Sequence, residues 1–462
     1  MTSSSLPRVA SGAAVLLLAS LSPAWPAAQA PSKDVRSREI QRLSAELKQG
    51  DPWPAIRRER IEKLLPVAMD AATVDAWVIF SRENHSDPLA RHVGGEHAGR
   101  LTAFVFTRVP SGVESHVIAP PTEVITLGEQ LTHARVVAGG AGESAFQLVA
   151  AYLRRKTPAA IAINKSELTV ADGLTATQYE QLIAALGPDL ARRLTSSEEL
   201  VHRWLAVKLP AEIEIMQKAG TLTSLLEYEA FDTVIPGITT NLDLQRYLRR
   251  RVEELELGHA WEDNPGIQSG LDRGRGSDAK RVIIPGDIID IDFGIKVYDT
   301  WCTDVQRFAY VLGPGETTLP PQIRKAWDAA RQSSRKMVAA MRPGVAGWQI
   351  DRVQVEWMES QGSLRHWAGT GHSVGYWAHD VGPSISGYSK DGPPRNAGAR
   401  ILEPGMVFAF DGNFVWTAED AGQKGTRSIT LEEMAAVTAS GAEYLTPVQE
   451  ELVLIKAPGS KR

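Results

Sequence analysis

The chain has 462 residues, of which 43% are hydrophobic and 23% charged, a composition typical of a soluble globular protein with two domains. A net charge of −5 and an isoelectric point near 6.1 exclude a strongly basic surface, so no nucleic acid is expected as a partner. Cys302 is the single cysteine, so the chain forms no internal disulfide and must be stabilised by its core.

The first thirty residues differ from the rest. Arg8 precedes an apolar run over residues 13–19, and the segment ends in Ala28-Gln29-Ala30. This order predicts a secretory signal peptide over residues 1–30, because the apolar run is too short to cross a bilayer. An uncleaved N-terminal anchor is the alternative. We therefore expect an exported protein, periplasmic or secreted, with no membrane association after cleavage.

Residues 31–50 are polar and predict a linker, followed by a helix over 56–72 that Pro66 should divide. Strands are predicted at 76–80, 101–107, 114–119, 134–137 and 159–163, and helices near 144–155 and 174–186. This alternation predicts an α/β domain over residues 51–200. A group of acids and histidines keeps no metal-ligand spacing and favours a polar surface or domain-edge loop: Glu83, His85, His92, Glu96 and His97.

The pattern changes near residue 200, where a second domain over residues 201–458 is predicted. Long helices are expected at 210–229 and 242–257, with Pro210 in the first turn of one and Asn241 capping the other. Helices at 320–341 and 346–361 and strands at 406–411, 428–438 and 451–455 follow an acidic hairpin. A weak duplication of a helix–hairpin unit within 205–455 stays open.

The acidic hairpin is the first stretch that suggests chemistry. Ile289 and Ile291 alternate with Asp290 and Asp292, which places the acids on one face of a strand, and Asp304 follows on the returning strand. Buried carboxylates are costly without positive compensation. Because no Lys or Arg obviously stands between them, the pair suggests a metal site. A solvated edge hairpin is the alternative.

Three later stretches carry further candidate ligands. His372 and His379 lie in a glycine-rich segment, Asp411 ends an apolar strand, and Glu432 lies inside another strand. With the two hairpin acids, His372, Asp411 and Glu432 form an oxygen-rich set with one nitrogen. Such a set suits two hard or borderline divalent ions, such as Mn²⁺, better than a zinc site built on thiolates. A pair of ions can lower the pKa of a bridging water.

The ordered motifs resemble metallopeptidase family M24, of the Xaa-Pro aminopeptidase and Xaa-Pro dipeptidase type. They are an Asp-x-Gly hairpin, a second Asp, a Gly-His with another His seven residues on, a Glu-Pro-Gly-Met strand and a final Glu. The resemblance implies an α+β chain in which a smaller α/β creatinase-like domain precedes a pita-bread (creatinase/aminopeptidase) catalytic domain. It also implies a dinuclear-metal-dependent exopeptidase that hydrolyses N-terminal Xaa-Pro-type peptide bonds with a metal-bridging hydroxide.

The resemblance further implies two divalent ions, with Mn²⁺ expected first and Co²⁺, Zn²⁺ or Fe²⁺ as alternatives. It implies a peptide as the substrate. A homodimer is one assembly that it leaves open. By position, it assigns the metal ligands as Asp292, Asp304, His372, Asp411 and Glu432. Asp304 and Glu432 would bridge both ions, and Asp411 would also accept a proton in catalysis. His379 would bind substrate or stabilise the tetrahedral intermediate, unless it only orders the turn at Asp380.

The sequence departs from the family pattern at several places. The spacing from Asp292 to Asp304 is one residue longer than usual, so we expect a β-bulge in the hairpin. Asp411 replaces a Glu, Ala368 stands where a His is frequent, and residues 272–280 lack another family His. Thr430 stands where prolidase-like members have Arg, and such losses around a metal site weaken it.

Two rival functions therefore stay open, a metal-free creatinase-like C–N hydrolase and a non-catalytic peptide-binding module on the same fold. Four tryptophans near the motifs either wall an apolar pocket for proline or pack in the core: Trp261, Trp301, Trp367 and Trp377.

Overall fold

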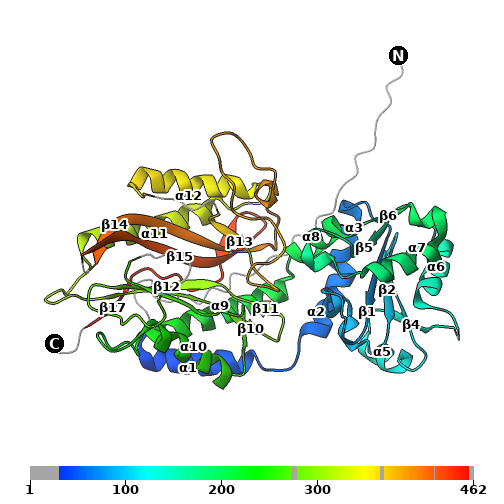
Figure 1. Cartoon of the computed structure of the whole chain (residues 1–462), viewed down its shortest axis with the longest axis horizontal. Helices are drawn as coiled ribbons and strands as arrows, with labels where there is room; N and C mark the ends of the chain where they lie inside the picture. Colours follow the sequence, from blue (N-terminus) through cyan, green and yellow to red (C-terminus); the bar gives the residue numbers. More distant parts are fainter. Residues whose placement is uncertain (1–30, 141, 272–277, 365–368, 421, 457–462) are drawn as a thin grey trace, which may run out of the picture.

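The computed structural model describes residues 31–140, 142–271, 278–364, 369–420 and 422–456. The predicted signal peptide at 1–30, Trp367 and Ala368 lie outside the described residues, as does most of the 272–280 segment. In the ranges given, no helix has the length and apolar character needed to cross a membrane. Figure 1 shows two lobes side by side, a smaller one from the N-terminal half and a larger one from the C-terminal half.

The smaller lobe is built on a six-stranded sheet in the order β4-β3-β2-β1-β5-β6, with mixed parallel and antiparallel pairing. Side chains of β1 alternate between two hydrophobic clusters, Trp77 and Ile79 in one and Val78 and Phe80 in the other, so both faces of the sheet are covered. The strands are β1 (Ala76–Ser81), β2 (Thr102–Val109), β3 (Gly112–Ala119), β4 (Arg135–Ala138), β5 (Ile161–Ile163) and β6 (Leu194–Ser196).

The helices of the smaller lobe agree with the predicted alternation. The helix expected over 56–72 is divided as predicted, into α2, a π-helical turn (Arg60–Leu64) and α3, with Pro66 in the first turn of α3. The helices are α2 (Trp53–Glu59), α3 (Leu65–Ala71), α4 (Ala90–Val93), α5 (Val124–Gln130), α6 (Ala145–Lys156), α7 (Ala176–Ala191) and α8 (Glu198–Ala206).

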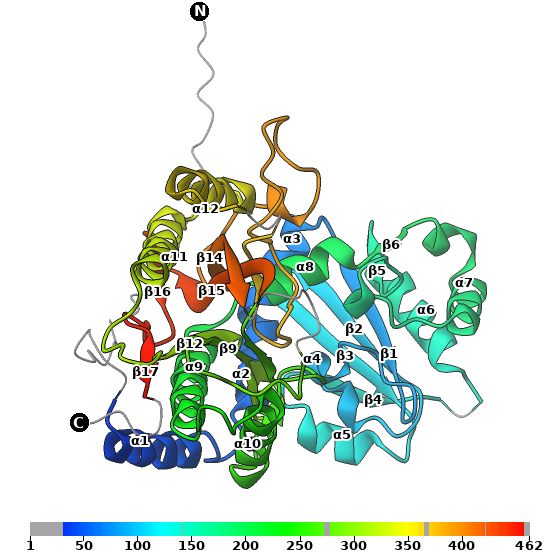
Figure 2. The same ribbon diagram turned by 60° about the vertical axis from the view of Figure 1, so that its left-hand side comes forward.

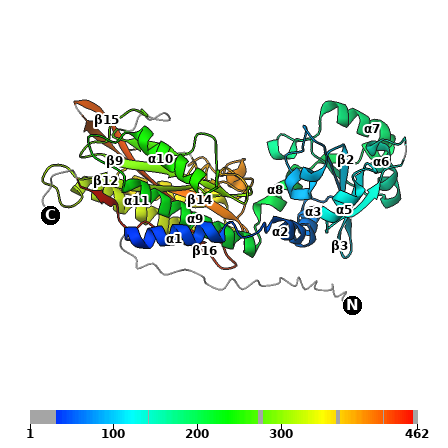
Figure 3. The same ribbon diagram turned by 90° about the horizontal axis from the view of Figure 1, so that it is seen from below.

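The linker predicted at 31–50 is wrong, because this segment forms helix α1 (Lys33–Glu46). Ile40, Leu43 and Leu47 are buried, which gives a polar segment one narrow apolar stripe at helical spacing. Figures 1 and 3 show α1 lying along α9 (Pro210–Phe231) of the larger lobe. The chain therefore begins its described part in the larger lobe and then crosses to the smaller one.

The larger lobe contains two four-stranded sheets between pairs of helices (Figure 2). One sheet has the order β17-β12-β9-β8 and the other β13-β14-β15-β16, and a small three-stranded sheet, β11-β10-β7, extends from the first. The bounds are β7 (Gly258–His259), β8 (Gly266–Ser269), β9 (Ile288–Phe293), β10 (Ile295–Val297), β11 (Trp301–Cys302), β12 (Val305–Val311), β13 (Gly371–Ser373), β14 (Val407–Asp420), β15 (Gln423–Val437), β16 (Ala442–Tyr444) and β17 (Val453–Ile455).

The element order of this lobe repeats. Two helices and a long hairpin, α9, α10 (Asn241–Glu254) and β9/β12, are followed by α11 (Pro321–Ala340), α12 (Gly347–Gln361) and β14/β15. The helix–hairpin duplication is therefore present at the level of element order. Thr240, not Asn241, caps α10, because its side chain accepts from the N–H of Asp243, whose carboxylate accepts in return.

The hairpin contains no β-bulge between its acids and its turn, so that prediction is wrong. The pairing offset is the same in β9–β12 and in β10–β11. The Thr300 N–H donates to the Val297 carbonyl at 3.0 Å, and Tyr298 and Asp299 have positive φ angles of 52° and 51°, as in a type I′ turn. Val297 pairs with Trp301 and not with Thr300. Thr300, the last residue of the turn, is therefore the one extra residue of the hairpin.

The two lobes meet at a buried ion pair. Arg60 of the smaller lobe donates to Glu212 of α9 at 2.6 Å, and both side chains are almost fully buried. Tyr376 and Trp301 donate to the other carboxylate oxygen of Glu212, at 2.6 and 3.1 Å. Although burial opposes it, the Arg60 charge and the hydrogen bond from Tyr376 hold the pKa of Glu212 below its usual value.

His92 also packs at this joint, with its ring 4.5 Å from that of Tyr376, and burial lowers its pKa well below the usual value. This histidine is therefore part of the buried lobe contact and not of a polar surface.

Candidate metal centre

Strand pairing places three predicted ligands on one face of the second sheet. Asp411 of β14 lies opposite Glu432 of β15, and His372 of β13 lies opposite Ala409, two residues from Asp411. Residues two apart on a strand share a face, as do directly paired residues. His372, Asp411 and Glu432 therefore project from the same side of the sheet.

The other two predicted ligands come from the first sheet. Asp292 of β9 lies opposite Gln306 of β12, and Asp304 stands two residues before Gln306. Carboxylate oxygens of Asp292, Asp304 and Glu432 lie within 4.8 Å of one another, so the acidic faces of the two hairpins meet. The alternation of Ile and Asp in β9 thus predicted the facing side of that strand correctly.

Imidazole nitrogens complete the cluster. Nε2 of His372 lies 3.7 Å from Oδ2 of Asp304 and 3.7 Å from Oε1 of Glu432. Ligand atoms of Asp304, His372 and His379 also lie within 4.8 Å of one another, and the two rings are 4.5 Å apart. Asp411 belongs to neither group of converging ligand atoms, which agrees with its short side chain.

The carboxylates oppose each other's ionisation. Burial raises the pKa of Asp292 to about 6, and a hydrogen bond joins it to Asp304. Burial and the charges of neighbouring acids raise the pKa of Asp304 and of Glu432 well above their usual values, and burial with the Asp292 charge does the same for Asp411. Burial and the charge of His379 lower the pKa of His372 to about 4, so its imidazole is neutral and can offer a lone pair to a metal ion.

These features fit divalent ions. Oδ1 of Asp292 and Oδ1 of Asp411 are buried without a hydrogen-bond partner in the described part of the chain. Within the same ranges, Asp304 and Glu432 lie 3.7 Å from Nε2 of His372, and none of the four carboxylates forms an ion pair with a Lys or Arg. Crowded carboxylates without a positive partner, beside a neutral imidazole, offer oxygen and nitrogen ligands to divalent cations, whose charge would neutralise that of the carboxylates.

His379 lies at the edge of the cluster, next to a turn that Asp380 orders. The buried carboxylate of Asp380 accepts from the backbone N–H groups of Tyr376 and Val381 and from Nζ of Lys208, at 2.7–3.0 Å. Asp380 therefore orders the turn through its own contacts. The exposed ring of His379 faces His372 and the adjoining cavity.

That cavity has a volume of about 740 Å³ and lies between the lobes. The smaller lobe contributes residues 168–170, and the larger lobe contributes His379, Trp261, Trp377, Arg395 and Arg400. Trp301, by contrast, is fully buried in the core, so the apolar-wall prediction does not hold for it.

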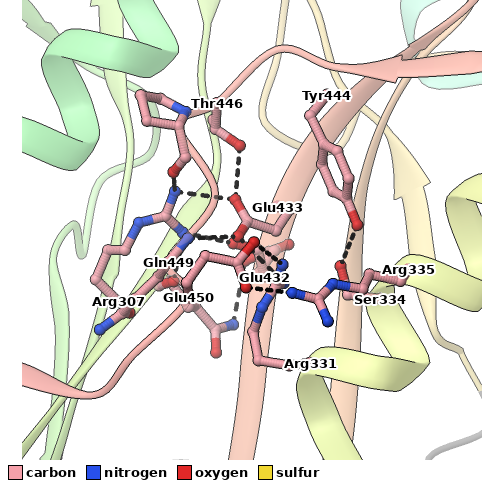
Figure 4. Close-up of polar contacts among 12 residues, drawn as sticks. Arg307, Arg331, Ser334, Arg335, Glu432, Glu433, Tyr444, Thr446, Gln449 and Glu450 are labelled. Carbon is pink, nitrogen blue, oxygen red and sulfur yellow. Dashed lines mark hydrogen bonds and ion pairs between the residues drawn. The ribbon is translucent and has the colours of Figure 1, made fainter. Parts of the chain in front are cut away.

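The opposite face of β15 carries a network that the sequence pattern did not reveal. Glu433 is fully buried and accepts from Nη2 of Arg307 at 2.9 Å, from the Thr446 hydroxyl at 2.7 Å and from the Gln449 N–H at 3.2 Å. Arg331 of α11 lies 3.6 Å from it (Figure 4). Consecutive glutamates on one strand therefore face opposite environments, acidic for Glu432 and basic for Glu433.

Comparisons with known proteins agree with this architecture. Residues 214–439 match the sequence profile of "Metallopeptidase family M24". The chain is 24% identical over 367 residues to "Probable dipeptidase PepE" of Mycobacterium tuberculosis, covering 77% of this chain and 86% of that protein. Two solved structures cover almost the whole fold.

The X-Pro aminopeptidase from Thermotoga maritima has a TM-score of 0.63 and 19% identity, and covers 84% of this chain and 100% of its own. The Xaa-Pro dipeptidase from Bacillus anthracis has a TM-score of 0.62 and 18% identity, and covers 87% of this chain and 100% of its own. The predicted α+β fold, a creatinase-like lobe before a pita-bread lobe, is thereby confirmed. Residues 214–439 therefore form a domain of metallopeptidase family M24, and the chain as a whole shares the fold of the two solved structures.

Proposed function

We propose that the protein is an exopeptidase that depends on two divalent ions and cleaves the N-terminal bond of short peptides, with Xaa-Pro bonds preferred. The convergence of Asp292, Asp304 and Glu432 with His372 and His379 carries this proposal. Similarity to proteins named as a dipeptidase, an X-Pro aminopeptidase and an Xaa-Pro dipeptidase supports the same class of reaction.

Each residue of the cluster has a role that follows from its position. Asp304 and Glu432 lie between the other donors and would hold both ions, while Asp292 would hold one and His372 and Asp411 the other. Bound ions, with Mn²⁺ foremost, would act as Lewis acids and lower the pKa of the hydrolytic water.

Two further groups act on the substrate side. His379 can donate to the carbonyl oxygen of the scissile bond, where negative charge develops. Asp411, whose Oδ1 has no hydrogen-bond partner among the described residues, can accept the proton of the water.

The cavity beside His379 supports a preference for short substrates. Trp261 and Trp377 offer apolar surface to a proline ring, and Arg395 and Arg400 offer positive charge to a peptide carboxylate. Arg400 is shared with Glu199 at 2.8 Å, whereas Arg395 is exposed. A dipeptide with a free carboxylate would therefore bind better than its amide.

The test uses the purified full chain with Mn²⁺, Co²⁺ or Zn²⁺ added to metal-free protein. Release of the first residue is measured from Ala-Pro, Ala-Pro-amide, Ala-Pro-Ala and Ala-Ala, beside Glu432→Gln as the inactive control and Arg395→Gln as the carboxylate control. Metal-dependent cleavage of Xaa-Pro peptides that Glu432→Gln lacks is the expected result. Metal binding without cleavage would favour a peptide-binding module, and cleavage without metal would favour a creatinase-like hydrolase.

A further inference from the structure

Gln306 connects the two sheets at the metal centre. It lies on β12, opposite Asp292 and two residues after Asp304, so it shares their face. Its Nε2 donates to Oε2 of Glu432 at 3.1 Å, and its Oε1 accepts from the Thr430 hydroxyl at 2.7 Å. One side-chain amide therefore bridges from the first sheet to two positions of β15 in the second.

The two ends of this amide are not interchangeable. An ionised carboxylate only accepts hydrogen bonds, so Glu432 requires the NH₂ end, and the carbonyl end must then face a donor. Thr430 supplies that donor from the same face of the same strand, two residues before Glu432. The Glu432 carboxylate thus sets the orientation of the amide, and the Thr430 hydroxyl holds the carbonyl end in place by donating to it.

The hydrogen bond also distinguishes the two oxygens of Glu432. Oε2 is held by Gln306, while Oε1 lies 3.7 Å from Nε2 of His372, on the side of the other ligands. The backbone at this position is fixed independently, because Nη1 of Arg307 donates to the Glu432 carbonyl at 3.1 Å. The remaining freedom of Glu432 is the rotation of its side chain, and Gln306 restricts that rotation.

We infer that Gln306 is a positioning residue that sets the carboxylate of Glu432 for metal binding, and that Thr430 acts through Gln306 by holding its amide in place. Because the amide is neutral, it fixes Glu432 without reducing the negative charge that attracts the ions. This inference rests on the proposed metal-dependent function.

The test measures Mn²⁺ affinity of metal-free protein by titration calorimetry, together with its urea unfolding. Gln306→Leu should weaken Mn²⁺ binding about tenfold to a hundredfold, the range for lost groups that orient metal ligands. Thr430→Val, which keeps the shape and removes the hydroxyl, should weaken it by a smaller factor, and Thr430→Ser should restore wild-type affinity. Gln306→Asn, a smaller change, serves if Gln306→Leu unfolds.

The double variant Gln306→Leu/Thr430→Val separates this mechanism from general loss of stability. If Thr430 acts through Gln306, the double variant binds Mn²⁺ no more weakly than Gln306→Leu alone. Independent, multiplying losses would overturn the role of Thr430, and unchanged affinity in both single variants would overturn the whole inference. Wild-type protein that binds no Mn²⁺ would instead refute the proposed function, and this role with it.

Discussion

The consecutive residues Glu432 and Glu433 should respond in opposite ways to the same substitution. Glu433→Gln removes the charge that two buried arginines share, Arg307 at 2.9 Å and Arg331 at 3.6 Å. Breaking a buried ion pair by removing one partner costs about 3–5 kcal/mol. We therefore expect Glu433→Gln to lower the free energy of unfolding by about this amount, with or without metal.

Glu432→Gln removes a charge from the opposite environment. Burial and the neighbouring acids raise the pKa of Glu432 well above its usual value, so its ionised form destabilises the metal-free protein. The amide should leave the stability of metal-free protein unchanged or raise it. It should also abolish the extra stability that Mn²⁺ confers on the wild type, because ligands that bind only the folded state stabilise it.

Urea unfolding near neutral pH, with a chelator and then with Mn²⁺, measures both effects. Glu450→Gln is the matched control, since Glu450 faces the same Arg331 at 3.7 Å but is 25% exposed, and such pairs contribute about 1 kcal/mol or less. A loss below about 1 kcal/mol in Glu433→Gln, or equal losses in Glu432→Gln and Glu433→Gln without metal, would refute the reasoning.

Three further predictions concern the same lobe. Mn²⁺ affinity should fall as the pH is lowered through about 6, because burial raises the pKa of Asp292 to about 6 and protons then compete with the metal; calorimetry in buffers of different ionisation enthalpy should show proton release, and a pH-independent affinity would contradict this. Asp411→Glu should tighten Mn²⁺ binding and raise kcat, since the longer side chain reaches the other ligands; unchanged titrations would mean that the site has adapted to Asp. Gly294→Ala should lower the free energy of unfolding by about 1–3 kcal/mol, because the added Cβ would overlap the Thr303 carbonyl oxygen; an unchanged urea midpoint would contradict it.

The sequence was informative where chemistry follows from local periodicity. Alternation of Ile and Asp in β9 identified the acidic face of that strand. The family resemblance predicted a ligand set of which Asp292, Asp304, His372 and Glu432 converge, whereas Asp411 lies in neither converging group. Gln306 and Arg307 were missed because their partners, Glu432 and Glu433, lie on a strand of another sheet more than a hundred residues away. No local pattern encodes such a contact.

Other misses had local causes. The polar composition of residues 31–50 concealed the narrow apolar stripe of α1, because a helix that packs along one line needs few buried residues. The expected bulge was inferred from residue count alone, whereas the structure accommodates the count beside Thr300 at the turn. The number of residues between the two acids fixes the length of the hairpin, but it does not show where in the hairpin the extra residue lies.

The ion pair at the lobe joint has a consequence for how the protein loses its structure. Separating the lobes would part Arg60 from Glu212 and the His92 ring from the Tyr376 ring, and would expose these buried groups to water. The lobes should consequently unfold as one cooperative unit, giving a single calorimetric transition although no disulfide crosses between them. For the same reason, the catalytic lobe should not survive excision as an independent domain.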